Sequence, residues 1–179
     1  MKNNFLVKQY ISDKKMEIRH NYLSEQFKNS KKILKLINNT VKFNDFTLGR
    51  YVDDFEREFC KHQKVKYAVG VGSGTDAIFL SLKALGIKDG DEVITPTYSF
   101  YATAGAIVTA GAKPVFVDVK DDLNIDENKI EKKITKKTKA IVPVHWSGRI
   151  CNMKKISSIA KKYHLHIVED ACHAILAHD

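Results

Sequence analysis

The stretch Tyr67-Ala-Val-Gly-Val-Gly-Ser-Gly-Thr-Asp-Ala77 contains a short apolar run, a glycine-rich turn and the start of a helix. Unbroken apolar runs of this length are typical of strands that are covered on both faces of a parallel sheet. We therefore expect a strand over Tyr67–Val71 and a helix over about Thr75–Leu85. A strand that enters a helix through a tight turn is the first half of a βαβ unit.

The same alternation continues toward the C-terminus. Further apolar runs predict strands over residues 92–95, 114–119, 140–144 and 166–169. Helical spacing predicts helices between them over about residues 100–110, 126–133 and 153–163. This order of elements predicts an α/β fold, in which a doubly wound, mainly parallel sheet carries helices on both faces.

The sequence before residue 67 predicts helices rather than strands. Ser24 can cap a helix that runs to about residue 38. A second helix is expected over about residues 50–62, with Val52, Phe55 and Phe59 on its buried face. The chain is therefore expected to place helices over about residues 24–62 before its βα units.

Length and composition restrict the organisation of the chain. With 179 residues, 44% hydrophobic and 28% charged, it has the composition of one globular domain or two at most. Residues 1–20 are polar and without helical or strand periodicity, so they predict a tail, and residues 21–179 predict the folded part of the chain. The N-terminal stretch has no apolar core and no run spans a bilayer, so no secretory signal or membrane contact is expected.

Charge and cysteine usage exclude further classes. The chain holds 30 Lys and Arg against 21 Asp and Glu, a net charge of +9, but only four of these cations are arginine. Nucleic-acid-binding proteins favour arginine, so this pattern argues against a nucleic-acid partner. Cys60, Cys151 and Cys172 are far apart and show no metal-ligand spacing. We therefore expect no disulfide framework and no metal site, as in a cytoplasmic protein.

The glycine-rich turn predicts a phosphate site. Gly72 and Gly74 permit a tight turn, and the free N–H groups of the following helix, with the hydroxyls of Ser73 and Thr75, favour an anion. The alternative is that these residues only form a tight βα turn. The glycines run G-x-G-x-G, which matches neither the dinucleotide fingerprint nor the P-loop.

Two further segments end strands at the same edge of the predicted sheet. Tyr98, Phe100 and Tyr101 supply rings that could stack on a flat heterocycle, and the alternative for Phe100 is core packing. Asp170 ends a buried strand, where a carboxylate needs a partner such as a cationic ligand nitrogen; the alternative is a helix cap or ion pair. Phosphate site, stacking ring and carboxylate together predict pyridoxal phosphate as the ligand.

Six ordered segments resemble the DegT/DnrJ/StrS-type sugar aminotransferases, which are fold-type I pyridoxal-phosphate enzymes acting on nucleotide-linked keto-sugars. The segments are FTLGRYVDDFEREF (46–59), AVGVGSGTDAI (68–78), GDEVITPTYSFYATAGAI (90–107), GAKPVFVDV (111–119), TKAIVPVHWSG (138–148) and VEDACHA (168–174). The resemblance covers about residues 16–176.

This resemblance implies a role for individual residues. Gly74 and Thr75 would hold the phosphate through backbone N–H groups, and Phe100 would stack on the pyridine ring. Asp170 would pair with the ring nitrogen, and His173 would lie near the phenolic oxygen of the ring. The family further implies an amino-acid donor, with glutamate expected, a keto-sugar acceptor and a homodimer with shared active sites.

The catalytic lysine of the family is not expected in these residues. It lies beyond the segment around Asp170, in a Ser-Phe-x-x-x-Lys-like motif, and none of the lysines here has that context. We therefore expect an incomplete large domain, no C-terminal small domain and no aminotransferase activity of the chain alone. His145 matches a family histidine that we expect to be structural. Two alternatives stay open: a non-catalytic remnant, and a nucleotide- or nucleic-acid-binding α/β domain.

Overall fold

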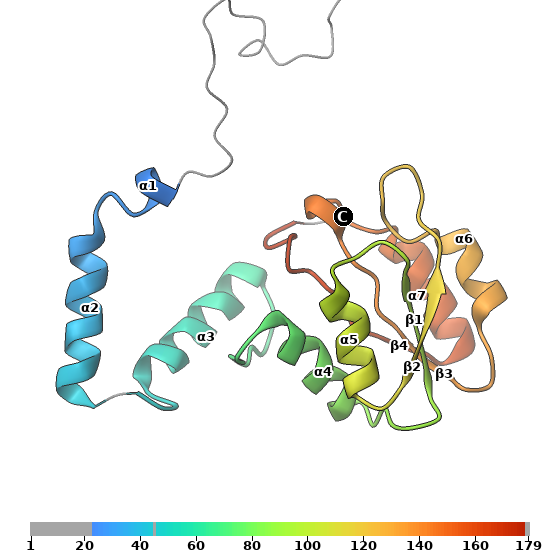
Figure 1. The fold of residues 1–179 in the computed structure, drawn as a ribbon, viewed down its shortest axis with the longest axis horizontal. Helices are drawn as coiled ribbons and strands as arrows, with labels where there is room; N and C mark the ends of the chain where they lie inside the picture. Colours follow the sequence, from blue (N-terminus) through green and yellow to red (C-terminus); the bar gives the residue numbers. More distant parts are fainter. Residues whose placement is uncertain (1–22, 45, 178–179) are drawn as a thin grey trace, which may run out of the picture. The chain divides into compact units, whose positions relative to one another are not determined.

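The chain divides between Arg50 and Tyr51 into two units. The computed structural model describes residues 23–44 and 46–177. The first unit contains the helices α1 (Leu23–Gln26) and α2 (Ser30–Phe43), and the second contains the sheet with the other helices (Figure 1). The predicted tail over residues 1–20 lies outside the described residues.

In the first unit, two helices replace the single helix expected from Ser24. The chain leaves the helical conformation after α1, and Asn29 precedes α2 with φ −108° and ψ 60°. Asn29 and Ser30 compete with helical hydrogen bonding and favour helix ends, so the expectation of one helix was wrong. Asn44 ends α2 in the left-handed conformation, with φ 52°, and its N–H bonds to the carbonyls of Thr40 and Val41.

The sheet of the second unit has four parallel strands. Its strands are β1 (Glu92–Pro96), β2 (Lys113–Val117), β3 (Thr138–Ile141) and β4 (His166–Ile167). Their order is β2-β1-β3-β4, so the first strand in sequence lies inside the sheet and the chain winds outward in both directions. The predicted parallel sheet is therefore confirmed, with strand ends displaced by one to three residues.

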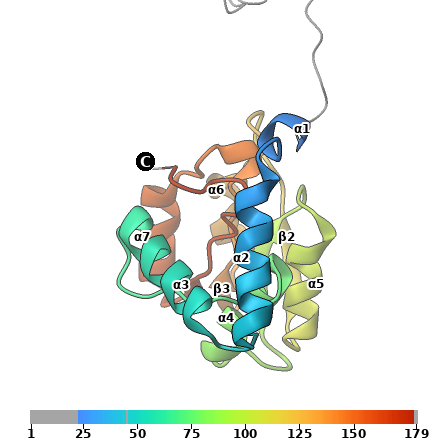
Figure 2. The same cartoon turned by 90° about the vertical axis from the view of Figure 1, so that its left-hand side faces the viewer.

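Helices cover both faces of this sheet. They are α4 (Gly74–Ala84) and α5 (Tyr101–Thr109) on one face, and α6 (Glu127–Ile130), the 3₁₀ turn η2 (Glu131–Lys133) and α7 (Met153–Tyr163) on the other. Val93 of β1 packs in a cluster with Ile107 of α5, whereas the next residue, Ile94, packs in a cluster with Ile156 of α7. Figure 2 shows α5 and α7 on opposite sides of the strands. The predicted doubly wound α/β fold is confirmed.

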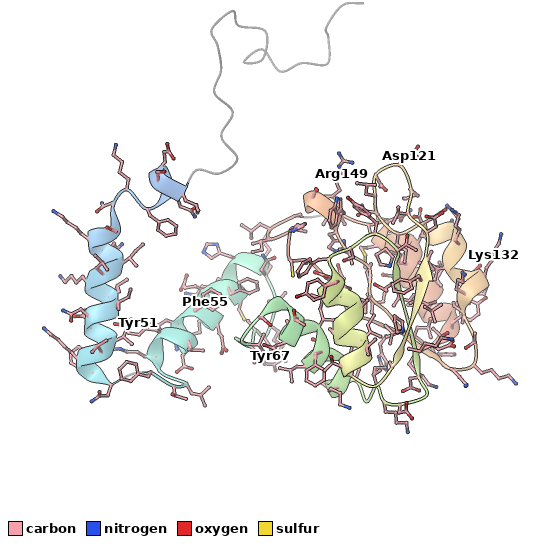
Figure 3. All side chains as sticks on the ribbon, viewed as in Figure 1. Tyr51, Phe55, Tyr67, Asp121, Lys132 and Arg149 are labelled. Atoms are coloured by element: carbon pink, nitrogen blue, oxygen red, sulfur yellow. The ribbon has the colours of Figure 1, made fainter. Side chains whose placement is uncertain are left out.

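The strand expected over residues 67–71 is not formed. Among the described residues no strand pairs with this segment, and the Gly70 N–H donates instead to Glu56 of α3 (Arg50–Gln63), at 2.6 Å. Tyr67, which Figure 3 labels, is exposed, and so is Val69. An apolar run becomes a strand only when a neighbouring strand accepts its backbone hydrogen bonds, and that partner is a property of the whole sheet.

Helix α3 forms where the spacing predicts it, but its apolar side is not buried. Val52 and Phe55 are exposed, and the rings of Phe55 and Phe59 pack at 5.9 Å between centroids. No residue of α3 is buried. The spacing determines the helix, whereas burial also requires a covering surface, which the described part of this unit does not provide.

We predict that Ile107 carries a large share of the stability of the second unit. Ile107 is fully buried between α5 and the sheet, whereas the adjacent Val108 is 59% exposed. Ile107→Ala should lower the free energy of unfolding by about 2–5 kcal/mol, because it removes buried methyl groups and leaves a cavity. Val108→Ala should change it by less than about 0.5 kcal/mol. Urea unfolding followed by circular dichroism measures both, and equal losses would contradict this packing.

Candidate functional site

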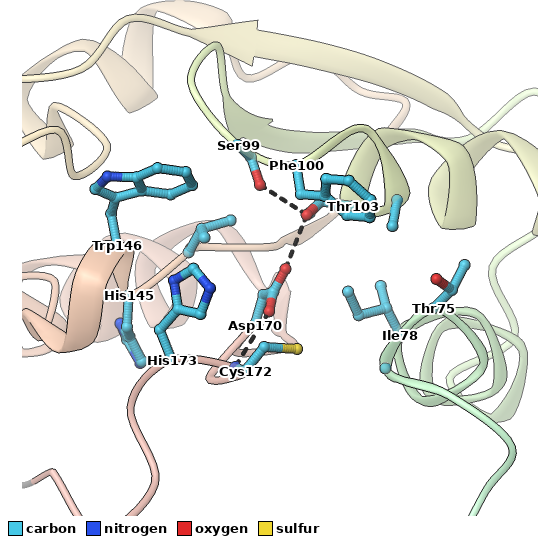
Figure 4. Close-up of a pocket in the computed structure, with 13 residues that line it drawn as sticks. Thr75, Ile78, Ser99, Phe100, Thr103, His145, Trp146, Asp170, Cys172 and His173 are labelled. Atoms are coloured by element: carbon cyan, nitrogen blue, oxygen red, sulfur yellow. Dashed lines mark hydrogen bonds between the residues drawn. The ribbon is translucent and has the colours of Figure 1, made fainter. Parts of the chain in front are cut away.

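A cavity of about 270 Å³ lies where the carboxyl ends of β1 and β4 meet the first turns of α4 and α5 (Figure 4). Ligands bind at this end of the strands in open α/β sheets. The structure brings all five residues predicted to bind the cofactor to the wall of this cavity, namely Gly74, Thr75, Phe100, Asp170 and His173. The sequence prediction therefore assembled one site from segments up to 99 positions apart, between Gly74 and His173.

The first turn of α4 presents free backbone amides to the cavity. Ser73 caps the helix: its hydroxyl accepts the Asp76 N–H at 3.1 Å, and its carbonyl accepts the Ala77 N–H at 3.0 Å. The N–H groups of Gly74 and Thr75 have no helical carbonyl to reach, and no hydrogen bond in the described part of the chain uses them. These two amides and the positive end of the helix dipole favour a phosphate.

The glycines of this turn keep those amides open. A Cβ atom on Gly72 would lie 2.8 Å from the Asp76 carboxylate, and a Cβ on Gly74 would lie 3.0 Å from the Cys172 sulfur. A side chain at Gly72 would therefore press on the Asp76 carboxylate, which accepts a hydrogen bond from the capping Ser73 hydroxyl. One at Gly74 would crowd the Cys172 side chain at the cavity wall, so glycine at these two positions leaves space beside the amides.

Asp170 is held at the end of β4 by backbone pairing and is only 8% exposed. Its N–H donates to the Pro143 carbonyl at 2.9 Å, and its carbonyl accepts the His145 N–H at 3.1 Å. The carboxylate oxygen Oδ2 accepts the Thr103 hydroxyl at 2.8 Å, whereas Oδ1 has a long 3.4 Å contact with the Cys172 N–H. A buried carboxylate with a poorly satisfied oxygen beside a cavity favours a cationic ligand group.

Phe100 precedes α5 and lines the cavity with its ring. The residue is 62% exposed, so core packing, the alternative left open by the sequence, is excluded. Its ring lies 4.3 Å from the Tyr101 ring at an angle of 54°. A large apolar ring at the mouth of a cavity is available to cover a flat ligand.

A second aromatic group forms the opposite wall. Trp146 packs edge-on against Tyr98, at 4.7 Å between ring centroids, and against His173, at 5.6 Å. Trp146 was not among the site residues predicted from the sequence. The available signal was its position directly after His145 at a strand end. Its ring restricts the shape of anything that enters from this side.

The turn η3 (Trp146–Gly148) holds that indole in place. Ser147 has φ 52° and Gly148 has φ 81°, and a Cβ on Gly148 would lie 3.1 Å from the His173 carbonyl. The side-chain oxygen of the buried Asn124 accepts the Trp146 N–H at 3.0 Å. The left-handed backbone and this contact fix the position of the turn relative to the end of β3.

His145 is buried below the cavity and is fully hydrogen-bonded. Its Nδ1 accepts the Cys151 N–H at 3.2 Å, so Nε2 carries the proton and donates to Glu169 at 2.8 Å. This contact holds the pKa of Glu169 below its usual range. The arrangement agrees with the structural role expected for His145, because both ring nitrogens are used to join the end of β3 to neighbouring segments.

Among the described residues, the cavity offers neither a thiolate nor a lysine amine. Loss of hydration raises the pKa of the Cys172 thiol to about 11, and its hydrogen bond to Asp170 and the carboxylate charge add to the shift. This thiol is therefore protonated at neutral pH. No lysine of the described chain lines the cavity, and no metal-ligating cluster occurs in the described residues. These side chains can bind and orient a ligand.

Comparison with known proteins gives matches over most of the chain. The DegT/DnrJ/EryC1/StrS aminotransferase family matches residues 28–179. A pleiotropic regulatory protein of Geobacillus stearothermophilus is 44% identical over 155 residues, which are 86% of this chain and 42% of that protein. The dTDP-3-amino-3,6-dideoxy-alpha-D-galactopyranose transaminase of Aneurinibacillus thermoaerophilus is 44% identical over 145 residues, which are 80% of this chain and 40% of that enzyme.

Solved structures agree with this assignment. The structure of NtdA from Bacillus subtilis with bound cofactor PMP superposes with a TM-score of 0.83 and 37% identity, covering 91% of this chain and 39% of that chain. The chain spans about 40% of the length of these relatives. None of the described helices has the length and apolar character that a membrane span requires. With a family match over residues 28–179 and this shared fold, the chain belongs to the DegT/DnrJ/EryC1/StrS aminotransferase family.

Proposed function

We propose that the chain forms the cofactor-binding part of a pyridoxal-phosphate-dependent aminotransferase, which transfers an amino group from an amino acid, such as glutamate, to a nucleotide-linked keto-sugar. One observation carries this proposal: the free amides of Gly74 and Thr75 and the buried carboxylate of Asp170 line the same cavity. The transaminase activity in the name of the Aneurinibacillus relative supports the choice of an amino-sugar reaction.

Each chemical part of the cofactor has a complementary group in the cavity. The amides of Gly74 and Thr75 would bind the phosphate, Asp170 would pair with the protonated ring nitrogen, and Phe100 would cover the ring. His173 would lie near the phenolic oxygen. When bound, pyridoxal phosphate supplies an electron sink for the reacting carbon.

The residues of the chain would anchor, orient and shield the cofactor. The phosphate contacts would fix one end of the cofactor, and the Asp170 carboxylate would fix the other. The cofactor would then have little freedom to rotate within the cavity. The rings of Phe100 and Trp146 exclude water from the space between these two ends. Since no described lysine lines the cavity, we assign proton transfer to a lysine outside these residues, and we propose that residues 1–179 alone bind the cofactor without turnover.

We also propose a domain organisation, a cellular location and an oligomeric state for the chain. Residues 21–179 would form part of the cofactor-binding large domain and would contain none of the small domain. The free thiols of Cys60, Cys151 and Cys172 support a cytoplasmic location, since disulfides are rare there. The exposed apolar side of α3, which includes Phe55, supports a homodimer in which a second copy covers such surfaces.

The first test of the proposal is binding of pyridoxamine 5′-phosphate, the amino form of the cofactor. We expect the chain to bind this ligand, and Gly74→Val to weaken binding by at least about tenfold, because the new side chain would crowd Cys172 at the cavity wall, beside the amides proposed to bind the phosphate. Gly105→Val is the matched control, since it also lies in a helix and no atom lies within 4 Å of its added Cβ. Isothermal titration calorimetry measures both affinities.

Two results would contradict the assignment of this site. A parent chain that does not bind pyridoxamine 5′-phosphate would contradict cofactor binding itself. A Gly74→Val variant with the affinity of the Gly105→Val control would place the phosphate elsewhere.

A further prediction concerns the ring of Phe100. Phe100→Ala should weaken binding of pyridoxamine 5′-phosphate by about two- to tenfold, because it removes the aromatic contact with the pyridine ring. It should lower stability far less than Ile107→Ala, since Phe100 is exposed and Ile107 is buried. Tyr101→Ala is the control, because Tyr101 is exposed but does not line this cavity. A larger loss of affinity for Tyr101→Ala would transfer the stacking role to that residue.

A further inference from the structure

Thr103 of α5 connects two segments that are far apart in the sequence. The residue is 1% exposed, and its hydroxyl oxygen lies 2.8 Å from Asp170 Oδ2 and 2.8 Å from Ser99 Oγ (Figure 4). Asp170 lies just after β4 and is 67 positions after Thr103 in the chain. A short run of three side chains therefore joins the start of α5 to the carboxylate in the cavity.

The direction of these hydrogen bonds follows from the chemistry of the groups. An ionised carboxylate only accepts, so Thr103 donates its single hydroxyl proton to Asp170. The Thr103 oxygen is then available as an acceptor, and Ser99 donates to it. The order is Ser99 to Thr103 to Asp170, and donors in such a chain polarise one another.

This chain of hydrogen bonds determines how the carboxylate faces the cavity. Thr103 holds Oδ2, and the backbone pairing of Asp170 with Pro143 and His145 holds its main chain. Oδ1 has a long 3.4 Å contact with the Cys172 N–H, and the Cys172 thiol also lies beside the carboxylate. Because each carboxylate oxygen can accept more than one hydrogen bond, acceptor capacity remains available to a ligand. A carboxylate fixed at one oxygen presents the other in a constant direction, which a charge-assisted hydrogen bond requires.

We infer that Thr103 is a positioning residue, which orients the Asp170 carboxylate toward the ring nitrogen of the cofactor, with Ser99 orienting Thr103 in turn. This inference rests on the proposed function, since the ring nitrogen is the cationic group that Asp170 would bind. If Thr103 has this role, its loss should weaken only the contact between Asp170 and the ring nitrogen of the ligand. A residue that only stabilises the fold would affect every ligand of the cavity equally.

The test uses a pair of ligands and a set of matched variants of the full chain. The ligands are pyridoxamine 5′-phosphate and its 1-deaza analogue, in which a C–H group replaces the ring nitrogen. Thr103→Val keeps the side-chain shape and removes the hydroxyl, whereas Thr103→Ser keeps the hydroxyl. Thr95→Val is the control, because Thr95 is equally buried but donates to the Val142 carbonyl, at 3.1 Å, within the sheet.

We expect the ratio of the affinities for pyridoxamine 5′-phosphate and its 1-deaza analogue to change only when Asp170 loses the hydrogen bond from the Thr103 hydroxyl. Thr103→Val should weaken binding of pyridoxamine 5′-phosphate roughly tenfold and leave binding of the deaza analogue nearly unchanged. Thr103→Ser should restore most of the parent ratio, and Thr95→Val should retain it. Ser99→Ala should shift the ratio in the same direction by a smaller factor, which keeps the test informative if Thr103→Val does not fold.

The opposite pattern would overturn the inference. If Thr103→Val, or Ser99→Ala in its place, binds both ligands with the parent ratio, Thr103 does not act through the ring nitrogen, although the proposed cofactor site would stand. If the parent chain binds pyridoxamine 5′-phosphate no better than the deaza analogue, Asp170 does not contact the ring nitrogen. A parent that binds neither ligand would contradict the proposed function together with this inference.

Discussion

The parallel backbone bridge between Val144 and Asp170 determines where the candidate site lies. Beyond the short β4, the Asp170 N–H bonds to Pro143 and its carbonyl accepts the His145 N–H. This pairing extends the ladder between β3 and β4 to the edge of the cavity. It fixes Asp170 opposite the first turn of α5, where Thr103 reaches its carboxylate, and beside the start of η3. Without this pairing, nothing would fix the position of the Trp146 ring relative to the Asp170 carboxylate.

The layers of the fold could be predicted because they depend on local patterns. Unbroken apolar runs predicted the four strands, because a strand covered on both faces buries every residue. In β1, Val93 packs against one helical layer and Ile94 against the other. The segment at residues 67–71 has the same pattern but forms no strand, because hydrogen-bonding partners in a sheet are not encoded within the segment itself. The burial of Phe55 was wrongly predicted for a related reason: helical spacing shows which side is apolar and leaves open what covers it.

Site residues that belong to a local sequence motif could be predicted more easily than residues whose role depends on contacts with distant parts of the chain. Gly74 and Thr75 were predicted because a glycine-rich turn before a helix has a local chemistry of its own. Asp170 and Phe100 followed from their positions at strand ends. Thr103 and Trp146 were not found, because the first depends on Asp170, 67 positions away, and the second on contacts with Tyr98 and His173. The signal that the sequence offered was a threonine, Thr103, four positions after Ser99.

Amide NMR of the ¹⁵N-labelled chain, titrated with pyridoxamine 5′-phosphate, shows directly which backbone N–H groups bind the phosphate of the cofactor. If the N–H groups of Gly74 and Thr75 bind the phosphate, these two amides should show the largest downfield shifts, saturating together with the amides that flank Asp170. Inorganic phosphate should shift the first pair alone. Saturable binding that leaves the Gly74 and Thr75 amides unchanged would contradict the proposed cofactor site, because the ligand would then be held at another part of the chain.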